Sequence, residues 1–520
     1  MGKRWKQWIA VLALGALVAS GGSALADEKS PAVLGEPEEV TPQPGQLMVL
    51  SLQESILLGL KNNLNIAIEG FNPQVREADV TSARAVFDPT VFAEVGFVST
   101  QIPNRSALAA VRQSKTDDFD YTVGFRQDLP TGGSYQLRLD NNRNFNNAAF
   151  FTLEDIDTST AYWSDLSLVV TQPLLKNFGV DINRTQIKIA ENDREISLDR
   201  FRQIVMEVIT QVQDVYWDLV FTIQDLEVAQ DSLRLARELA ELNRARVRAG
   251  VAAPVEIIQA ETDIAARTAG VVLAEKAVRD TEDRLKVVLN IPKEGEWGGA
   301  IHPADPARFS EVHLDLPAAI TDALHKRPDY EAAKIEVSNR ELNLRFVRNQ
   351  LLPDLSFQGS VGINGLSAID PTYGKALDDL RSTNNFSYSA GLVLSIPIGN
   401  RAAGAEFVKA HLEREQAKVS LRNLELEITA EVREAVRRVE ASAKLVEDTR
   451  AASRLAGEQL RIEQRRLEAG VSTTFEVLRF QRDLAAARSA EVRSLTTYIK
   501  SLANLDRARG VVFEKHGIRM

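Results

Sequence analysis

Two stretches of this sequence, Leu52–Pro89 and Leu316–Pro353, decide how the fold is read. The first begins LQESILLGLKNN and ends FDP; the second begins LPAAITDALHKR and ends LLP, with equal spacing between the first Leu and the Pro. Matching pieces follow both copies in the same order: strand-like ends TQPLL at Thr171–Leu175 and SIPIG at Ser395–Gly399, then turns within Arg248–Ala265 and Glu468–Ala485. A repeated unit of this length predicts an internally duplicated, pseudo-symmetric architecture.

The N-terminus has the pattern of an export signal. Lys3, Arg4 and Lys6 precede the apolar run Ile9–Val18, and Ala24-Leu25-Ala26 resembles a signal-peptidase site. Removing residues 1–26 takes away three positive charges, so the net charge of -10 becomes about -13. An acidic mature chain argues against nucleic acid as a partner. We therefore expect an exported protein that does not bind nucleic acid.

Composition also limits how the chain could meet a membrane. The sequence has no cysteine, which excludes disulfides and an acylated N-terminal Cys. After the signal peptide no run of 18 apolar residues occurs, so helical membrane spans are not expected. If this chain crosses a membrane, it must do so with strands.

Long helices dominate the predicted structure. Apolar residues recur at spacings of three and four over Thr185–Ala249 and Ala402–Ala469, and at 1.5 Å per residue about 65 residues would span about 100 Å. Shorter helices, Pro254–Leu289 and Thr474–Arg509, follow them, and each copy opens with a helix of about 36 residues. On the helices alone, an ordinary periplasmic coiled coil is an alternative interpretation.

Period-two segments argue against that alternative. In Asp354–Asn364 and Phe386–Ser395, apolar residues alternate with small or polar ones, as in transmembrane β-barrels. Val91–Phe97 and Ser164–Thr171 fit the same pattern, and an extra hairpin, Tyr121–Asp140, turns at Leu129–Gly133. Six strands from one chain cannot enclose an interior, because about eight is the smallest number that does so. We therefore expect oligomerisation, with strand edges closed by neighbouring copies.

These paired features make the chain resemble the TolC-like outer-membrane efflux protein family over about residues 48–510. The resemblance is carried by SLQESILLGLKNNLNI and DLPAAITDALHKRPDY, by Pro89, Pro353, Pro173 and Pro397 at helix–strand junctions, and by the turns around Gly250 and Gly470. It implies an α+β homotrimer: a transmembrane β-barrel in the outer membrane, continued by a long periplasmic α-helical barrel. Such proteins are passive ducts that work with a periplasmic adaptor and an inner-membrane transporter. Four strands per chain is usual for the family, whereas the hairpin Tyr121–Asp140 favours six here.

The expected division of the chain follows from this reading. It comprises a signal peptide (1–26), a flexible leader (27–50), a first repeat (51–290, strands about 90–172), an equatorial linker (291–315), a second repeat (316–509, strands about 354–396) and a C-terminal tail (510–520).

Function is expected at the two turns between antiparallel helices. Gly250 and Gly470 suit the left-handed residue that ends a helix, and Thr473 with Glu476 has the spacing of a capping box. The residues expected to dock an adaptor are Gly250, Val251, Ala252, Ala253, Gly470, Val471, Ser472 and Thr473. Glu256 and Glu476 would complement the helix dipole, and by resemblance they are candidates for the periplasmic gate. In relatives a second acidic residue follows one turn later, where this chain has Arg479.

Enzymatic chemistry finds little support in the sequence. The five histidines are scattered, and neither a nucleophile–base constellation nor a phosphate loop occurs, so no catalytic, cofactor or metal residues are expected. Asp117-Asp118 and Asp378-Asp379 are expected in solvated external loops. The sequence thus favours an exit duct for efflux or type I secretion, leaving open drugs, metals, siderophores or proteins as cargo. The alternatives are a trimeric structural or adhesive stalk and, less well supported, an outer-membrane enzyme with a helical extension.

Overall fold

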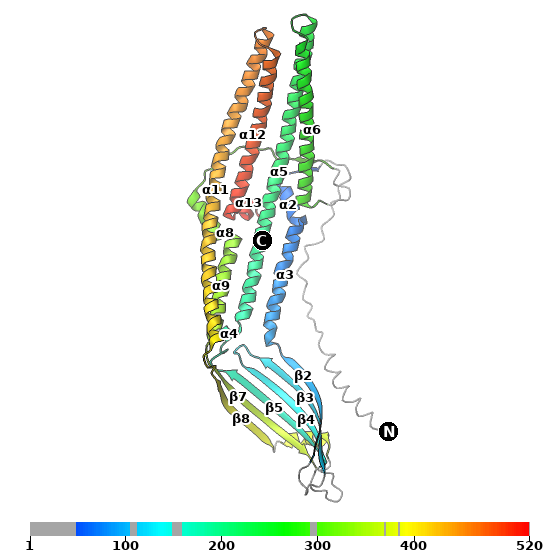
Figure 1. Cartoon of the computed structure of the whole chain (residues 1–520), viewed down its shortest axis with the longest axis vertical. Coiled ribbons are helices and arrows are strands. Elements are labelled where there is room, and N and C mark those ends of the chain that lie inside the picture. The colour runs from blue at the N-terminus through cyan, green and yellow to red at the C-terminus, as the bar shows by residue number, and fades with distance from the viewer. Residues whose placement is uncertain are drawn as a thin grey trace, which may run out of the picture. The chain divides into compact units, whose positions relative to one another are not determined.

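The computed structural model describes residues 48–103, 112–147, 159–291, 299–368, 371–382 and 385–518. The expected signal peptide and nearly all of the expected leader lie outside these residues. Almost everything described belongs to one compact unit, Met48–Ile291 with Ile301–Met520. Within this unit, long helices end in two hairpins at one extremity, and a β-sheet lies at the other (Figure 1).

Four long helices form the two hairpins. They are α5 (Thr185–Arg248), α6 (Val255–Leu289), α11 (Arg401–Glu468) and α12 (Thr474–Arg509), close to the predicted bounds. The predicted apolar stripe of α5 is the core: Val205, Val212 and Leu219 are at most 1% exposed and pack with Ile56 and Leu285. The apolar residues spaced by three and four on α5 are thus the buried ones, as predicted. Among the residues described, none of the helices has the length and hydropathy needed to cross a membrane.

The opening helix of each expected repeat is divided, where the sequence suggested a single helix. The first expected repeat has α2 (Leu52–Asn62) and α3 (Leu64–Arg84), and the second expected repeat has α8 (Leu316–Lys326) and α9 (Pro328–Asn349). Asn63 is extended and its side chain accepts hydrogen bonds from the first amides of α3. Arg327 is extended because the proline that follows it disfavours helical backbone. A short 3-10 turn, η1 (Ala85–Phe87), then leads α3 toward the sheet.

The sheet contains six antiparallel strands in the order β2-β3-β4-β5-β7-β8. Their bounds are β2 (Thr90–Pro103), β3 (Gln113–Asp128), β4 (Ser134–Asn146), β5 (Thr160–Pro173), β7 (Asp354–Ser367) and β8 (Phe386–Ser395). The sheet therefore has the six strands that the hairpin Tyr121–Asp140 favoured. Asp117 and Asp118 lie within β3, and Asp378 and Asp379 lie in the helix α10 (Tyr373–Ser382), so the expectation that both pairs occupy loops is wrong.

The two faces of the sheet differ chemically. One row of register partners runs across all six strands and is apolar throughout: Ala93, Val123, Leu139, Leu166, Ile363 and Phe386. The neighbouring row on the opposite face is polar and acidic: Glu94, Thr122, Asp140, Asp165 and Asn364. Large apolar side chains on the first face are exposed, among them Val95 (73%) and Tyr388 (78%). A single chain therefore leaves an apolar sheet face uncovered.

Small elements complete the unit, most of them near the middle of α5 and one at its sheet end. Strand β1 (Met48–Leu50) pairs in parallel with β6 (Ile301–Pro303), and the short helices α4 (Val180–Asn183) and α13 (Val512–His516) complete the fold. Asp305 Oδ2 accepts hydrogen bonds from Leu52 N (2.6 Å) and from the hydroxyl of Tyr216 (3.0 Å). Burial raises the pKa of Tyr216 to about 12, so the phenol stays a donor. Parts of the expected leader, linker and tail thus have regular structure.

Candidate functional site

The turns at the two hairpin ends have the same backbone conformation. Gly250 and Gly470 both have φ of +74°, a conformation that residues with a side chain rarely adopt. In each turn the glycine N–H donates to the carbonyl three residues back, and the following amide reaches five back, Val251 to Arg246 and Val471 to Arg466, both at 2.9 Å. This pair of backbone hydrogen bonds ends the descending helix and reverses the chain. The predicted left-handed conformation of both glycines is confirmed, and their part in adaptor docking stays a prediction.

The short turns present small and apolar side chains at the extremity of the hairpins. Val251 is 67% exposed and Val471 66%. Ala252 and Ser472 are half-buried, whereas Ala253 and Thr473 are exposed. The Ser472 hydroxyl donates to the buried carboxylate of Glu463, so this side chain is partly committed to the turn itself. The two turns thus offer similar, accessible surfaces.

Glu256 links the two hairpins. It lies in the first turn of α6, and its Oε2 accepts a hydrogen bond of 2.6 Å from the hydroxyl of Thr474 on α12. That hydroxyl also lies 3.1 Å from Oδ1 of Asn243, and the Asn243 amide donates to the Glu256 carbonyl at 3.5 Å. Thr474 and Asn243 are at most 1% exposed. We call these three residues, Asn243, Glu256 and Thr474, the tip contact.

Glu476 has a different partner, although its position after the turn matches that of Glu256. Its carboxylate pairs with Arg479 at 3.0 Å, and the Arg479 guanidinium lies 4.8 Å from the centroid of the Phe480 ring. Thr473 accepts from the Glu476 amide at 3.4 Å, which is one half of the predicted capping box. The carboxylate that would complete the box faces Arg479 instead. The two gate candidates therefore have unequal electrostatic surroundings.

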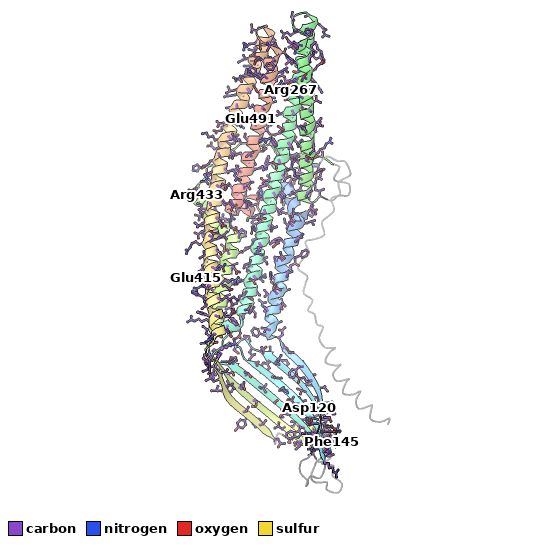
Figure 2. The ribbon with its side chains drawn as sticks, viewed as in Figure 1. Asp120, Phe145, Arg267, Glu415, Arg433 and Glu491 are labelled. Atoms are coloured by element: carbon purple, nitrogen blue, oxygen red, sulfur yellow. The ribbon has the colours of Figure 1, made fainter. Side chains whose placement is uncertain are left out.

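A second contact between the hairpins lies about two turns further along α6. Asp263 is 6% exposed and accepts from Arg267 Nε at 2.5 Å and from Arg482 Nε, on α12, at 3.0 Å. Arg267 also donates to the carbonyl of Ser232 at 2.8 Å. Burial lowers the pKa of Arg267, and Asp263 opposes this effect. Figure 2 shows Arg267 in the half of the unit that carries the hairpin ends, far from Asp120 in the sheet.

Sequence reasoning did not select Asn243, Thr474, Asp263 or Arg267. One signal was available for Asn243: it lies seven residues before Gly250, as the buried Glu463 lies seven before Gly470. Polar residues at the same distance from both turns, within otherwise apolar stripes, indicate a buried polar contact. Which hairpin each side chain would meet could not be read from the sequence.

The polar face of the sheet is the other candidate surface. Asp118, Asp120 and Asp140 each accept a hydrogen bond from a side chain on the next strand, at 2.5 to 2.6 Å. Arg138 pairs with Asp140 at 2.8 Å. Carboxylates outnumber the cations on this face, so it carries a negative potential. Among the residues that the structure describes, no group of three or more acidic or histidine side chains could hold a metal ion.

Comparison with known protein families matches two segments of the chain. Residues 155–290 and 319–511 match the family described as outer membrane efflux protein, with one segment in each expected repeat. The chain is 26% identical over 322 residues to the pyoverdine export outer membrane protein OpmQ of Pseudomonas putida, covering 60% of this chain and 63% of the relative. It is 22% identical to nodulation protein T of Rhizobium leguminosarum bv. trifolii, over 68% and 72% of the two chains. This chain therefore spans just under two thirds of the length of OpmQ.

Solved structures agree on the fold. The outer-membrane channel OprN aligns over 91% of this chain and 96% of its own, with a TM-score of 0.63 and 15% identity. VceC of Vibrio cholerae gives 0.63 over 88% and 96%, with 14% identity. MtrE of Neisseria gonorrhoeae, solved in an open state, gives 0.61 over 88% and 89%, with 18% identity. At these identities the likeness concerns the arrangement of helices and strands.

Proposed function

This chain belongs to the outer membrane efflux protein family, and we propose that it is the exit duct of a tripartite efflux or type I secretion system. In this function the sheet crosses the outer membrane, and the helices carry the passage through the periplasm. The chain itself performs no bond chemistry. An inner-membrane transporter supplies the energy, and a periplasmic adaptor connects it to the hairpin ends.

One observation carries the proposal: one face of the sheet has an apolar row across all six strands, and the opposite face has a polar, acidic row across β2, β3, β4, β5 and β7. In a barrel wall the apolar face meets lipid and the polar face lines water. The acidic inner face would favour cations over anions in the passage.

Open edges support closure by further copies of the chain. Within the described residues β2 and β8 each have one neighbouring strand. Because successive strands are antiparallel, β2 and β8 run in opposite directions, so β8 of one copy could pair with β2 of the next in a continued antiparallel ladder. Three copies would contribute 3 × 6 = 18 strands. A closed ring removes the unpaired edges that lipid does not tolerate.

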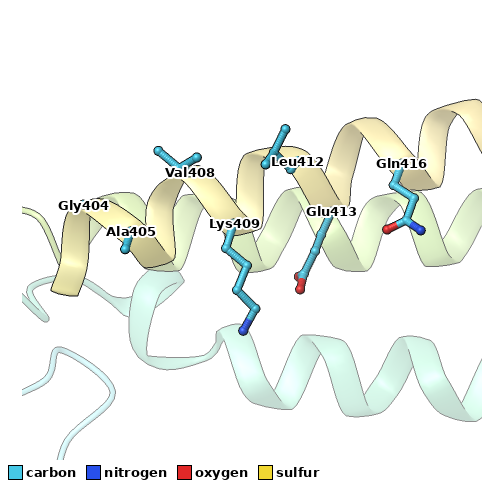
Figure 3. A pocket seen from close by; sticks show the side chains of 7 residues that line it. All are labelled: Gly404, Ala405, Val408, Lys409, Leu412, Glu413 and Gln416. Carbon is cyan, nitrogen blue, oxygen red and sulfur yellow. The ribbon is translucent and has the colours of Figure 1, made fainter. Parts of the chain in front are cut away.

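The helices have matching uncovered edges. Near the sheet, α3 packs on α5, α5 on α9 and α9 on α11, so α3 and α11 lie at opposite ends of the layer. Exposed apolar residues follow α3 (Leu64, Ile68, Phe71 and Val75) and α11 (Val408, Leu412, Val419 and Leu426). Figure 3 shows the α11 end of this surface, a shallow groove lined by Gly404, Ala405, Val408 and Leu412 among others. Contact between α3 and α11 of successive copies would bury both stripes.

The hairpin ends are proposed as the docking and gating region. Val251, Ala252 and Ala253, with Val471, Ser472 and Thr473, would contact the adaptor. In a trimer Glu256 and Glu476 would form two sets of three carboxylates at the periplasmic mouth. Because Glu476 is paired with Arg479, Glu256 and its bond to Thr474 are the stronger candidates for holding the mouth closed.

The proposal does not select one transported substrate. The relative OpmQ is named for pyoverdine export and others for resistance or nodulation, so the similarity selects no single substrate. A barrel-anchored stalk without transport is less well supported, because the matching family is an efflux family and the two hairpin ends present similar accessible turns.

The first experiment uses the absence of cysteine in the sequence. Thr473→Cys, an exposed position, is labelled with a short photo-crosslinker in cells, and captured proteins are identified. Capture of a periplasmic adaptor supports the duct, and the transporter that co-purifies with it identifies the cargo class. Capture of only the protein's own subunits, together with no conductance in planar bilayers, would instead favour the stalk.

A further inference from the structure

The helix α10 lies against one face of the sheet. A Cβ atom added to Gly365 of β7 would lie 2.0 Å from the carbonyl oxygen of Ala376, so the helix backbone touches the strand. Ala376 and Leu380 are buried at 0% and 7% exposure. Asp379 fixes the helix further, because its Oδ2 accepts a hydrogen bond of 3.1 Å from Leu366 N. The packing is close and uses a position where only glycine fits.

The face that α10 covers is the apolar one. Gly365 belongs to a row of register partners with Ser164, Asn141, Tyr121 and Val95. This row lies two residues along each strand from the row of Ala93, Val123, Leu139, Leu166 and Ile363, so both rows point to the same side. The helix therefore lies on the side that the proposed function turns toward lipid, not in the passage.

The chemistry of this face changes beneath α10. Asn141 and Ser164, 2% and 0% exposed, are joined by a hydrogen bond of 2.7 Å, and the next row outward carries Arg143 and Tyr162. Tyr373 of α10 lies between Tyr121 and Tyr162, with ring centroids 5.2 and 4.4 Å away. Tyrosines gathered where an apolar face becomes polar are typical of the membrane–water interface.

The exposed surface of α10 also combines apolar and charged side chains, like the part of the sheet beneath it. Leu377 is 37% exposed beside the buried stripe, whereas Asp378 and Arg381 have side chains 75% and 86% exposed. We propose that α10 is an interfacial helix that contacts the headgroup region of the outer leaflet and marks the outer limit of the apolar band. This inference rests on the proposed function, because it requires the apolar face to meet lipid.

Depth-dependent quenching tests this placement. Leu377→Cys, Val361→Cys and Ser167→Cys are each labelled with an environment-sensitive fluorophore and reconstituted as full-length protein in phosphatidylcholine vesicles. The lipids carry a nitroxide either at the headgroup or in the middle of the acyl chain. We expect residue 377 to be quenched most by the headgroup nitroxide, residue 361 by the mid-chain nitroxide, and residue 167, on the polar face, by neither.

The outcomes separate the two proposals. The interfacial helix is wrong and the barrel stands if residue 361 is quenched but residue 377 is not. The same holds if the mid-chain nitroxide quenches residue 377 as strongly as residue 361. If residue 361 escapes quenching, the apolar face does not meet lipid, and the proposed function fails with it.

A glycine variant tests whether the sheet holds the helix in place. Gly365→Ala in the Leu377→Cys background must displace α10, and we expect headgroup quenching at residue 377 to be lost. Gly391→Ala is the matched control, because a Cβ there meets open space. Unchanged quenching in a Gly365→Ala protein that still inserts would overturn the proposed packing.

Discussion

At the scale of single residues, polar atoms in apolar surroundings hold the two hairpins together. The tip contact joins α5, α6 and α12 through one hydroxyl, that of Thr474, which reaches both Glu256 and Asn243. Asp263 similarly joins Arg267 and Arg482 from the two hairpins. Hydrogen bonds to charged groups contribute roughly 1.5–3 kcal/mol each. In the proposed function, a few such contacts would hold the periplasmic mouth closed and could still be broken by the adaptor.

Thr474→Val should weaken the tip contact without changing the volume of the side chain. Glu256 would lose its donor from the other hairpin, at a cost of roughly 1.5–3 kcal/mol, and we expect a larger or more frequent open conductance in planar bilayers. Thr262→Val is the control, because the Thr262 hydroxyl is bonded only to its own helix, at Ile258. Equal conductance in both variants and the unmodified protein would show that this contact does not restrain the mouth.

At the scale of elements, alternation along a strand determines which residues face water. Leu139 and Asp140 are neighbours on β4, yet they belong to the apolar and the acidic row respectively. A shift of one residue in register would exchange the two environments for the whole strand. The Gly-Gly turn before β4 and the Pro residues at strand ends are features that help to fix this register.

Single cysteines on β4 test the assignment of the two faces. A charged, membrane-impermeant thiol reagent should modify Asp140→Cys in inserted protein and reduce conductance, because in the proposed barrel that side chain faces the passage. Leu139→Cys, one residue earlier, should resist the same reagent, since in the proposed barrel lipid covers it. Modification of both, or of Leu139→Cys alone, would contradict the barrel orientation.

The helix α13 is expected to respond to pH. Gln213 Nε2 lies 2.7 Å from His516 Nε2, and because the amide N–H donates, the imidazole must accept and be neutral. Burial lowers the pKa of His516, with nearby Lys515 acting in the same direction and Asp506 opposing it. The unfolded state therefore binds more protons, and stability present above about pH 6.5 is lost as the pH falls.

Hydrogen exchange can measure this effect. Amides of α13 should exchange faster as the pH falls below about 6.5, after correction for intrinsic rates. His516→Gln keeps an acceptor for Gln213 but cannot titrate in this range, so its corrected protection should stay constant. A pH dependence that persists in His516→Gln would assign the effect to another group.

At the scale of the whole molecule, one chain leaves large apolar surfaces uncovered. The sheet ends in open strands, and the helix layer ends in the apolar stripes of α3 and α11. Both kinds of edge lie on corresponding sides, because α3 leads into β2 and β8 leads into α11. One head-to-tail contact would therefore close strands and helices together.

Ile68→Glu should disrupt this assembly. Ile68 is 64% exposed in the single chain, and burying an unpaired carboxylate against a neighbour costs at least several kcal/mol. We expect less trimer in native electrophoresis and light scattering of detergent-purified protein. Glu69→Gln, at the adjacent half-buried position, should leave assembly intact; an unaffected Ile68→Glu trimer would place the interface elsewhere.

The sequence alone determined the elements and their environment. Apolar residues spaced by three and four identified α5 and α11, and period-two alternation identified the strands, because both patterns record directly which side of an element avoids water. Gly250 and Gly470 marked the hairpin ends, since a left-handed backbone favours glycine. The breaks at Asn63 and Arg327 were missed, although Pro328 was a local signal for the second.

Tertiary structure decided which side chains meet. Thr474 reaches Glu256 across 218 positions of sequence, and no local pattern specifies such a distant partner. Glu256 and Glu476 look equivalent in the sequence, but the pairing with Arg479 and the bond to Thr474 give them different surroundings. The position of α10 over Gly365 likewise depends on how a loop folds back onto the sheet. Periodicity reports burial, whereas contact between elements depends on their packing in three dimensions.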